Sequence, residues 1–541
     1  MKWIRAIFLI GVAAIVAAAP AHAQNSESDS RAVAVQPYIE VSQILSAELT
    51  PGDDVLTYTQ VAAGVDVSAQ GRNSGLSASV RYERNIGYGD DVVDSDTISG
   101  IARGYLSVVP RALTLEAGAL ASRTRVDGAG GTTSNPLVRE NDAEGQIYSG
   151  YIGPNINTSI GQVELTGYGR VGYTRFETDN AVFDANGDPV DVFDESVTYN
   201  ANLRAGVAPG EPLPIGVGVG GGYFQEDISN LDQRVRDVYV RGDITVPVSS
   251  TLALVGGVGY EDVEISSRDA LRDINGDPVI GNDGRFVTDQ STPRVLAYDV
   301  DGFIWDVGVL WQPSSRTSLA ATIGRRYDST TYYGSFSYVP NSRSQFNVAA
   351  YDGVSGFGGV LNNSLASIPT EFSAVRNSLT GDFGGCVGGD EGAVCTDALG
   401  SVRSATFRGR GVQATYQRRL GRFNASVGAG YNQREFIAAA GTVLEAADGL
   451  TDESYYVTGS LGREIGQNAS LQANAYINWF DNGSLDGGGD LTAYGASAAY
   501  SRSIAGNLSA RAALAVDYFD SEFSAEDFAF ATALLGLRYD F

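Results

Sequence analysis

Two acidic segments of the sequence offer the carboxylate and carbonyl oxygens that calcium prefers. They read DANGDPV, residues 184–190, and DINGDPVIGNDGRF, residues 273–286. An EF-hand loop needs glycine at position six and glutamate at position twelve, but counted from Asp273 these positions hold Pro278 and Gly284. The Asn–Gly and Asp–Gly pairs in these segments are instead typical of hairpin turns. We therefore expect turns, no cofactor, and at most loose Ca²⁺ binding by clustered loop carboxylates.

The only two cysteines, Cys386 and Cys395, lie in the longest predicted loop, residues 353–402. An exported chain enters an oxidising compartment, where such cysteines form disulfides. We predict a disulfide between them. Two roles stay open: the bond protects the loop from proteolysis, or the loop folds inward and narrows the lumen of a wide barrel.

Catalytic side chains are scarce in this chain. Lys2, His22 and Met1 are its only lysine, histidine and methionine. All three lie in the N-terminal segment that we expect to be cleaved. The mature chain therefore lacks Ser-His-Asp and Cys-His catalysis and most zinc ligands. The net charge of −27 disfavours nucleic acid, because phosphates require a basic surface. We predict that the protein is neither an enzyme nor a nucleic-acid-binding protein.

The N-terminus has the order of a secretory signal peptide. A basic start and an apolar run, residues 6–19, precede small residues at Ala21 and Ala23. The apolar run is too short for a spanning helix, which needs about 20 residues. The predicted domains are a signal peptide over residues 1–23, a periplasmic tail over 24–34 and a barrel over 35–541.

Segments with alternating apolar and polar residues recur along the rest of the chain. In LSASVRYER, Leu76, Val80 and Tyr82 share one face, and Arg81 and Glu83 share the other. The connections alternate between short turns and long, mostly acidic loops, as periplasmic turns and extracellular loops do in outer-membrane barrels. We predict an all-β fold, a transmembrane antiparallel up-and-down β-barrel of about 22 strands (18–22). Its location would be the outer membrane of a Gram-negative bacterium.

The chain ends in an amphipathic strand, ALLGLRYDF, whose apolar face carries Leu537, Tyr539 and Phe541. A closed barrel needs a last strand that pairs with the first one and removes the edge. We predict that these three residues are also the assembly signal that the barrel assembly machinery reads. A TonB-dependent transporter would have a similar number of strands, but it needs a plug domain ahead of its barrel, and we expect none here.

Charged residues on the polar strand faces are predicted to point into the lumen. Facing acidic and basic side chains can set a transverse field that selects solutes. Alternatively, they form ion pairs that only brace a filled barrel. The predicted lumen charges are Arg81, Glu83, Arg103, Glu116, Glu164, Arg170, Asp237, Arg241, Asp243, Asp306 and Arg326.

A second set of arginines continues the apolar, lipid-facing register near the extracellular strand ends. Charge near the membrane interface costs only about 0–1 kcal/mol, and a guanidinium matches phosphate geometry. We predict that this set contacts lipopolysaccharide, with solvated rim arginines as the alternative. The residues are Arg84, Arg123, Arg125, Arg175 and Arg325.

Four segments carry a family resemblance: QPYIEVSQ, LVGGVGYEDVEISSRD, AYDVDGFIWDVGVLWQPS and LLGLRYDF. Over nearly the whole mature chain, the sequence resembles a poorly characterised family of outer-membrane β-barrels close to the putative β-barrel porin type 2 group. Similar chains are sometimes labelled a preprotein translocase subunit, a role that nothing in this sequence supports.

The resemblance carries no catalytic motif. The expected function therefore depends on the family likeness and on the size of the barrel. We expect a porin-like barrel for passage of small hydrophilic or saccharide-like solutes. The alternative is a non-conducting structural or accessory barrel, linked to exopolysaccharide export or envelope integrity, because some members of the wider group lie near such export systems. Polysaccharide-export components would then be its partners, beside outer-membrane lipid and lipopolysaccharide.

Overall fold

The computed structural model describes most of the mature chain. The described residues are 32–88, 95–126, 132–133, 143–178, 181, 191–210, 213–373, 376, 379, 386–389, 392–395, 402–483, 490–521 and 527–541. The predicted signal peptide, residues 24–31 of the predicted tail and the acidic segment 184–190 lie outside them. Within this part of the chain, no helix is long and apolar enough to cross a bilayer.

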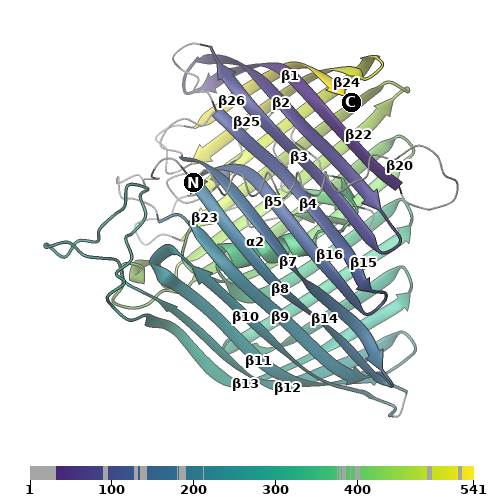
Figure 1. The fold of residues 1–541 in the computed structure, drawn as a ribbon, viewed down its shortest axis with the longest axis vertical. Helices are drawn as coiled ribbons and strands as arrows, with labels where there is room; N and C mark the ends of the chain where they lie inside the picture. The colour runs from purple at the N-terminus through teal and green to yellow at the C-terminus, as the bar shows by residue number, and fades with distance from the viewer. Residues whose placement is uncertain are drawn as a thin grey trace.

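Antiparallel strands follow one another around a closed ring (Figure 1). The sheet has 23 strands in the described residues, and leaving out the two-residue β6 (Thr132–Thr133) gives 23 − 1 = 22 long strands. The first eleven are β1 (Ala32–Thr50), β2 (Val55–Gln70), β3 (Ser74–Gly87), β4 (Ser95–Val109), β5 (Leu113–Val126), β7 (Ala143–Ile160), β8 (Val163–Thr178), β9 (Glu195–Val207), β10 (Gly216–Ile228), β11 (Gln233–Pro247) and β12 (Leu252–Ser267).

The second eleven strands complete the ring. They are β13 (Val295–Ser314), β14 (Thr317–Arg326), β15 (Ser329–Asn341), β16 (Ser344–Ser355), β20 (Phe407–Leu420), β21 (Phe423–Phe436), β22 (Thr451–Ile465), β23 (Ala469–Asn482), β24 (Asp490–Ala505), β25 (Leu508–Ser521) and β26 (Phe528–Asp540). The predicted fold class and strand number are confirmed. The first strand begins at Ala32, three residues before the expected start at residue 35.

The last strand closes the barrel against the first. β26 pairs with both β25 and β1, in a register that places Tyr539 opposite Ile39. The Phe541 amide continues this ladder by donating to the Pro37 carbonyl at 3.0 Å. Leu537, Tyr539 and Phe541 are exposed on the outer face. Their reading by the assembly machinery stays a prediction.

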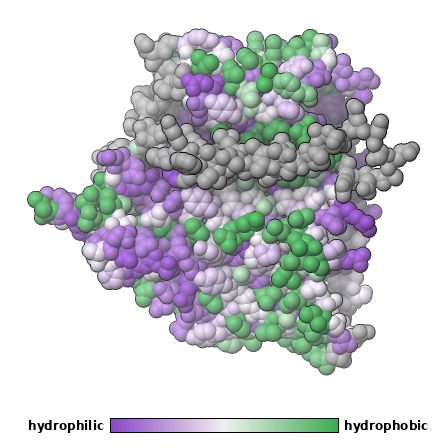
Figure 2. Space-filling view, viewed as in Figure 1, coloured by the Kyte–Doolittle hydropathy of each residue, from purple (hydrophilic) through white to green (hydrophobic). Residues whose placement is uncertain are grey.

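The two-residue period of the strands separates an apolar outside from a polar inside. On β3, Arg81 and Glu83 are buried inward, whereas Tyr82 between them is 44% exposed outward. Figure 2 shows apolar side chains over the strand wall and hydrophilic ones gathered at the left, where the long β12–β13 connection lies in Figure 1. Lipid can solvate this apolar wall, and the ring leaves no backbone edge unpaired in lipid. The fold is that of a Gram-negative outer-membrane barrel.

The hairpin turn between β14 and β15 lacks the residues from which a turn is usually predicted. β14 and β15 are joined by Tyr327 and Asp328 alone, and both have positive φ, 53° and 52°. Two-residue hairpin turns need such angles and usually contain Asn–Gly or Asp–Gly. Here tertiary contacts hold the turn instead, because the Tyr327 amide donates to Glu261 Oε1 at 2.6 Å and its hydroxyl to Asp237 at 3.0 Å.

Connections at the extracellular end pack against one another and form what we call the cap. The long β12–β13 connection contains two tight turns, at Gly276 (φ 94°) and Gly284 (φ 78°), as expected from its Asn–Gly and Asp–Gly pairs. An apolar cluster includes Leu231, Ala270 and Leu444. The described cap consists of residues 191–194, 229–232, 268–294, 402–406 and 437–450.

Candidate functional site

A helix lies inside the barrel between opposite walls. Helix α2 (Phe357–Ser367) begins two residues after β16, and Figure 1 shows it behind the strands β5–β9. Leu361 and Leu365 are buried in a cluster with wall residues such as Ile147 and Phe176. Val360 packs against this cluster and also against Phe407 and Phe436, which belong to β20 and β21 across the lumen. The helix therefore fills space that an open barrel leaves to water.

The sequence of α2 explains its close fit to the wall. Phe357, Leu361 and Leu365 recur at helical spacing and form one apolar face. Gly358 and Gly359 precede the hydrophobic half of the helix. A Cβ atom at Gly358 would overlap the Ser196 hydroxyl, and one at Gly359 would overlap the Ser355 hydroxyl. A side chain at either position would force these hydroxyls to shift, so the close approach favours glycine, although glycine weakens a helix interior.

The N-terminus of α2 is held by a buried carboxylate. Glu226 of β10 is fully buried. It accepts hydrogen bonds from the Gly356 amide at 2.7 Å and the Gly359 amide at 3.0 Å. The hydroxyls of Ser196 and Ser355 donate to it at 3.0 Å and 3.2 Å. Helix N-termini leave amide donors without intrahelical partners and favour negative charge, so Glu226 satisfies both demands.

The C-terminus of α2 is held by a charge of the opposite sign. The Arg103 guanidinium of β4 donates to the Leu365 carbonyl at 3.3 Å and to the carbonyls of Ala366 and Ile368. Glu116 of β5 pairs with the same guanidinium at 3.2 Å. Positive charge stabilises the carbonyl end of a helix. Glu226 and Arg103, which we call the clamp, thus match the two ends of the helix dipole.

The chain continues along the inner wall after α2. The Arg376 guanidinium donates to the Ser99 hydroxyl at 2.6 Å and the Ser79 hydroxyl at 3.2 Å. Leu379 is buried in a cluster with Ile44 and Leu534. Arg376 and Leu379 of the predicted loop 353–402 therefore lie against the inner wall, as α2 does.

Backbone pairing also brings the two cysteines together. β18 (Cys386–Gly389) and β19 (Gly392–Cys395) form a hairpin in which Cys386 is directly opposite Cys395. β17 (Phe372–Ser373) joins β18 as a third strand. This register is the one that a disulfide across the hairpin would need, and the disulfide stays a prediction.

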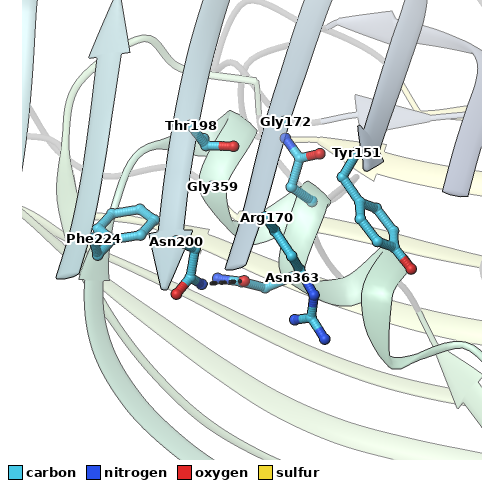
Figure 3. A pocket seen from close by; sticks show the side chains of 9 residues that line it. Tyr151, Arg170, Gly172, Thr198, Asn200, Phe224, Gly359 and Asn363 are labelled. Atoms are coloured by element: carbon cyan, nitrogen blue, oxygen red, sulfur yellow. Dashed lines mark hydrogen bonds between the residues drawn. The ribbon is translucent and has the colours of Figure 1, made fainter. Parts of the chain in front are cut away.

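A pocket lies where the periplasmic side of α2 meets the wall. Figure 3 shows the Arg170 guanidinium between Tyr151 and Asn363, and the Asn200 amide bonded to Asn363 at 3.1 Å. Arg170 stacks over the Tyr168 ring at 4.3 Å. The lining consists of Tyr151, Arg170, Gly172, Thr198, Asn200, Phe224, Gly359, Asn362 and Asn363.

Most predicted lumen charges are paired with neighbours on the same wall. The structure thereby favours bracing over a free transverse field. Glu164 is exposed near the periplasmic end of β8, with its charge close to Arg204. The nearest pairs are Arg81 with Glu40 (2.9 Å) and Glu83 (3.1 Å), Arg103 with Glu116 (3.2 Å), Arg241 with Asp306 (2.6 Å), Arg204 with Asp243 (2.6 Å), and Arg326 with Asp237 (2.9 Å) and Glu261 (2.8 Å).

The predicted lipopolysaccharide contacts divide into two groups. Arg84 is exposed and pairs with Asp96 at 2.9 Å, Arg175 pairs with Glu177 at 3.3 Å, and Arg325 pairs with Asp328. All three stay candidates for phosphate contact. The side chain of Arg125 lies outside the described residues. Arg123 belongs to the second group, because the structure places it away from the surface.

Arg123 turns inward because the wall is incomplete beside it. Pairing between β4 and β5 stops at Gly100 and Ala121, and beyond that point the Gln146 amide donates to the Ile98 carbonyl at 2.9 Å. The Arg123 side chain passes this gap, is only 4% exposed, and lies 3.4 Å from Glu83. Strand alternation alone predicted that Arg123 lies on the outer surface. The structure shows its side chain buried, so the predicted surface position of Arg123 is corrected.

Two carboxylates of the cap have opposite pKa shifts. Burial raises the pKa of Asp191, although the Ser404 hydroxyl and the Asn230 amide donate to it. Burial also raises the pKa of Asp232, but Arg294 and Arg268 donate to this carboxylate and lower its pKa by more, so the net pKa is below its usual range. Asp232 therefore links both ends of the β12–β13 connection.

We expect Asp232→Asn to loosen the β12–β13 connection at pH 7. Because the folded pKa lies below the unfolded value of about 3.9, the stabilisation is present above that value and is lost as pH falls through the folded pKa. Hydrogen exchange of residues 269–292 should become about fivefold to tenfold faster in the variant, corresponding to about 1 kcal/mol. Asp277→Asn, an exposed carboxylate of the same connection, is the control. Equal protection in the wild type and in Asp232→Asn would contradict this role.

Metal binding gains no support from the described residues. They contain no group of three or more histidine, cysteine, aspartate or glutamate side chains that could hold a metal ion. Segment 184–190, one of the two acidic segments, lies outside these residues. Loose Ca²⁺ binding stays a prediction.

The clamp and the inner helix are the features that the sequence analysis missed or left open. Arg103 was expected in the lumen, but its helix partners were not expected, and Glu226 was not among the predicted site residues. One signal was present, namely the helical spacing of Phe357, Leu361 and Leu365 inside the predicted loop. Nothing local connects that spacing with Glu226.

Comparison with known proteins gives a likeness of fold alone. No family model matches the chain, and no curated protein matches it. The FrpB iron transporter from Neisseria meningitidis (F3-3 variant) has 12% identity and a TM-score of 0.44, with 93% of this chain and 81% of that chain covered. The ferric-catecholate import receptor Fiu from E. coli K12 has 10% identity and a TM-score of 0.44, with the same coverage. The ferric citrate transporter FecA has 10% identity and a TM-score of 0.42, with 93% and 78% covered. Membership of the porin type 2-like group stays a prediction.

The predicted function needs correction. The lumen holds α2 and an apolar cluster that includes Ile147, Phe176 and Leu361, where a porin has a water-filled channel. The prediction of a porin-like barrel for small hydrophilic or saccharide-like solutes is wrong. The alternative, an accessory barrel for exopolysaccharide export or envelope integrity, has no better support.

Proposed function

We propose that this protein is a gated outer-membrane uptake barrel of the receptor type, closed by α2 until the helix is released from its clamp. The observation that carries the proposal is the clamped helix itself. Side chains of opposite charge, Glu226 and Arg103, hold the two ends of an apolar helix between facing walls. A helix that only filled the barrel would need apolar contacts alone.

Two further features support a gate. The clamp residues belong to the wall, whereas α2 belongs to a connection, so release of the helix leaves the ring of strands intact. Gly356 precedes the helix in an extended conformation, and Ile368 follows it in another. Connections that end in such segments absorb the changes of backbone angle that gate movement requires.

Conductance of single barrels in planar bilayers tests this proposal. We expect the wild type to be closed and Glu226→Ala to open intermittently, because the helix N-terminus loses its acceptor. Adding Asn200→Cys and Asn363→Cys, whose side chains now touch, should lock α2 to β9 and close Glu226→Ala again until a reductant is added. Glu226→Ala with reductant but without the cysteine pair is the control. An open wild type would contradict closure by α2, and so would a silent Glu226→Ala in which hydrogen exchange shows a released helix.

A further inference from the structure

Backbone pairing between β15 and β16 covers only part of their length. The ladder stops at Gly334 and Ala350, although both strands continue toward the extracellular end. Residues 329–333 keep their pairing with β14, and residues 351–355 keep theirs with β20. All of these residues are described, and the first range does not pair with the second. We call this interruption the second joint, and the interrupted pairing of β4 with β5 beyond Gly100 the first joint.

The outer faces of β16 and β20 become buried at the second joint. Val412 of β20 is 42% exposed, and Arg408 continues the same face, because side chains alternate along a strand. The Arg408 side chain is nevertheless only 8% exposed. Its partner across the ladder, Val354 of β16, is buried in a cluster with Val263 and Ile265 from the inner face of β12. The end of β16 therefore lies on the lumen side of the wall to which β12 belongs.

The first joint overlaps in the same way. Arg123 continues the outer face of β5, but its side chain lies against the inner face of β3 and β4, 3.4 Å from Glu83 and 3.4 Å from the Thr97 hydroxyl. At both joints the strand that follows in the chain lies inside the strand that precedes it. The joints divide the ring into a first arc, β5 and β7–β15, and a second arc, β16, β20–β26 and β1–β4. Each arc begins inside the ring and ends outside it.

A guanidinium replaces the missing ladder at the second joint. Arg408 of the second arc donates to the Thr330 carbonyl at 3.2 Å and to the Ser329 hydroxyl, both on β15 of the first arc. Asp352 of β16 positions this guanidinium through two hydrogen bonds of 2.8 Å. Open strand edges are costly in a bilayer unless protein covers them, and the overlap provides that cover. We call Arg408 and Asp352 the latch.

Movement of one arc against the other breaks few contacts at this joint. β16 pairs with β20 over its whole length, up to Ser355 and Phe407, so it stays fixed to the second arc. The first arc is also low here, because β14 ends at Arg326, and residues 295–304 of β13 pair with β12 but not with β14. A shift at the extracellular end breaks the contacts of the latch and of Val354. The paired lower parts of β15 and β16 then serve as the hinge.

The clamp on α2 joins the two arcs. Glu226 belongs to β10 of the first arc, and it accepts from the Ser355 hydroxyl at the end of β16 and from the Gly356 amide that follows. Arg103 belongs to β4 of the second arc. A shift of the second arc draws Ser355 and Gly356 away from Glu226, so the helix cannot keep both ends bound.

The inward-lying end of the second arc also narrows the lumen. Phe407 and Phe436, at the extracellular ends of β20 and β21, are buried in a cluster against which Val360 of α2 packs. Release of α2 alone leaves both rings where they are. A wide passage therefore needs movement of these strand ends as well as of the helix.

We propose that the overlapping ends of the two arcs slide past each other at the second joint, and that this movement opens the gate. It frees the N-terminus of α2 from Glu226 and draws the inward strand ends toward the wall. The inference rests on the proposed function, because it names the movement that regulates the same gate. The latch holds the closed position, and Arg408 acts in it as a positioning residue.

Spin labels on the outer face report this movement in full-length mature barrels in lipid nanodiscs. One pair, Thr330→Cys with Val412→Cys, lies across the second joint on β15 and β20, two strands apart. The control pair, Val412→Cys with Val457→Cys, is also two strands apart, but on β20 and β22 of one arc. All three positions are exposed, and Cys386→Ser and Cys395→Ser remove the native thiols.

Replacement of the latch should loosen one pair only. In Arg408→Met combined with Asp352→Asn, we expect the distances across the joint to spread to longer values by one strand spacing, about 5 Å, while the control pair keeps its distance. Arg410→Met is the matched control variant, since Arg410 lies 3.6 Å from Asp352 but makes no hydrogen bond to a described residue of β15. If the double replacement prevents folding, Ser329→Ala, which removes one acceptor only, tests the same joint. Unchanged distances across the joint in the folded variant would overturn the inference.

A cross-link at the joint separates this inference from the gate itself. Ser329→Cys and Arg408→Cys, joined by a bifunctional thiol reagent as long as the lost arginine side chain, replace the latch with a reducible covalent link. In Glu226→Ala the link should abolish the conductance steps until a reductant is added, while hydrogen exchange still reports a released α2. Glu226→Ala with Ser329→Cys alone, treated with the same reagent, is the control.

The outcomes of the cross-link distinguish the two proposals. Conductance of the linked barrel equal to that of unlinked Glu226→Ala would overturn the sliding of the arcs and leave the gate in place. A Glu226→Ala barrel that never conducts would contradict the gate, and the spin labels would then still decide whether the arcs move. The two proposals therefore fail separately.

Discussion

Arg81→Met is expected to lower the free energy of unfolding of the barrel by about 3 kcal/mol or more. The guanidinium donates to Glu40 at 2.9 Å, to Glu83 at 3.1 Å and to the Gln60 amide oxygen at 3.0 Å. Both carboxylates are 2% exposed. Removal of one partner from a buried ion pair costs about 3–5 kcal/mol, because a charge is left without compensation.

The lower end of that range is expected because other cations remain nearby. Arg511 lies 3.2 Å from Glu40, and Arg123 lies 3.4 Å from Glu83. Guanidinium-induced unfolding in lipid bilayers, followed by tryptophan fluorescence, measures the change. The combination Arg81→Met and Glu83→Gln should recover part of the loss, because Glu40 then keeps Arg511 as its partner and Arg123 keeps Glu144, 3.9 Å away.

Arg84→Met, three residues further along the same strand, is the control. Arg84 is exposed on the outer face, where its pair with Asp96 is 2.9 Å long. Exposed ion pairs contribute about 0–1 kcal/mol, so this variant should stay close to the wild type. An equal loss from both variants would show that inward burial does not determine the effect.

Glu226→Ala is expected to release α2 while the strands stay folded. The change removes the acceptor of two backbone amides and two hydroxyls at a fully buried position. Each unsatisfied buried donor costs about 1–3 kcal/mol, but a released helix can expose these donors to water. We therefore expect the protection of residues 356–367 against hydrogen exchange to fall about 100-fold, which corresponds to about 3 kcal/mol.

The strands provide an internal reference for this measurement. Amides of β9 and β10 should keep their protection, since they pair with each other and with the adjoining strands. Glu226→Gln should have an intermediate effect, because it keeps one acceptor oxygen. Glu435→Ala, an exposed glutamate of β21, should change nothing. Full protection of α2 in Glu226→Ala would show that apolar contacts alone hold the helix.

The wall of the barrel could be predicted because its determinants are local. The alternation of Leu76, Val80 and Tyr82 with Arg81 and Glu83 reports directly which side chains face lipid. The same alternation placed the lumen arginines on the correct face. It failed for Arg123, because the rule assumes a continuous wall, and the pairing of β4 with β5 stops before that residue.

The inner helix could be predicted only in part. Phe357, Leu361 and Leu365 have helical spacing, but the glycine pair next to them and the loop around them indicate irregular structure. The partner of the helix N-terminus, Glu226, is 130 residues away from Gly356. No pattern in one sequence connects positions that are so far apart, so the clamp required a three-dimensional structure.

The prediction of the function was wrong, and the reason is related. A barrel of 22 strands accommodates many activities, and fold alone does not select among them. The expectation of a passive or gated pore assumed a lumen that solutes can pass, at most narrowed by loop 353–402. The side chains that fill it, such as Val360 and Phe407 on opposite sides, come from segments that the sequence leaves unconnected.

The order of strands around the ring also determines how the barrel can assemble. Most neighbours in the ring are neighbours in the chain, so hairpin after hairpin can be added through short-range contacts. The pairing of β1 with β26 is the exception, because it joins the two ends of the chain. Until β26 arrives, β1 and β25 each keep an open edge. The strands that carry Arg103 and Glu226, β4 and β10, precede α2 in the chain, so both clamp residues can be in place before the seam closes.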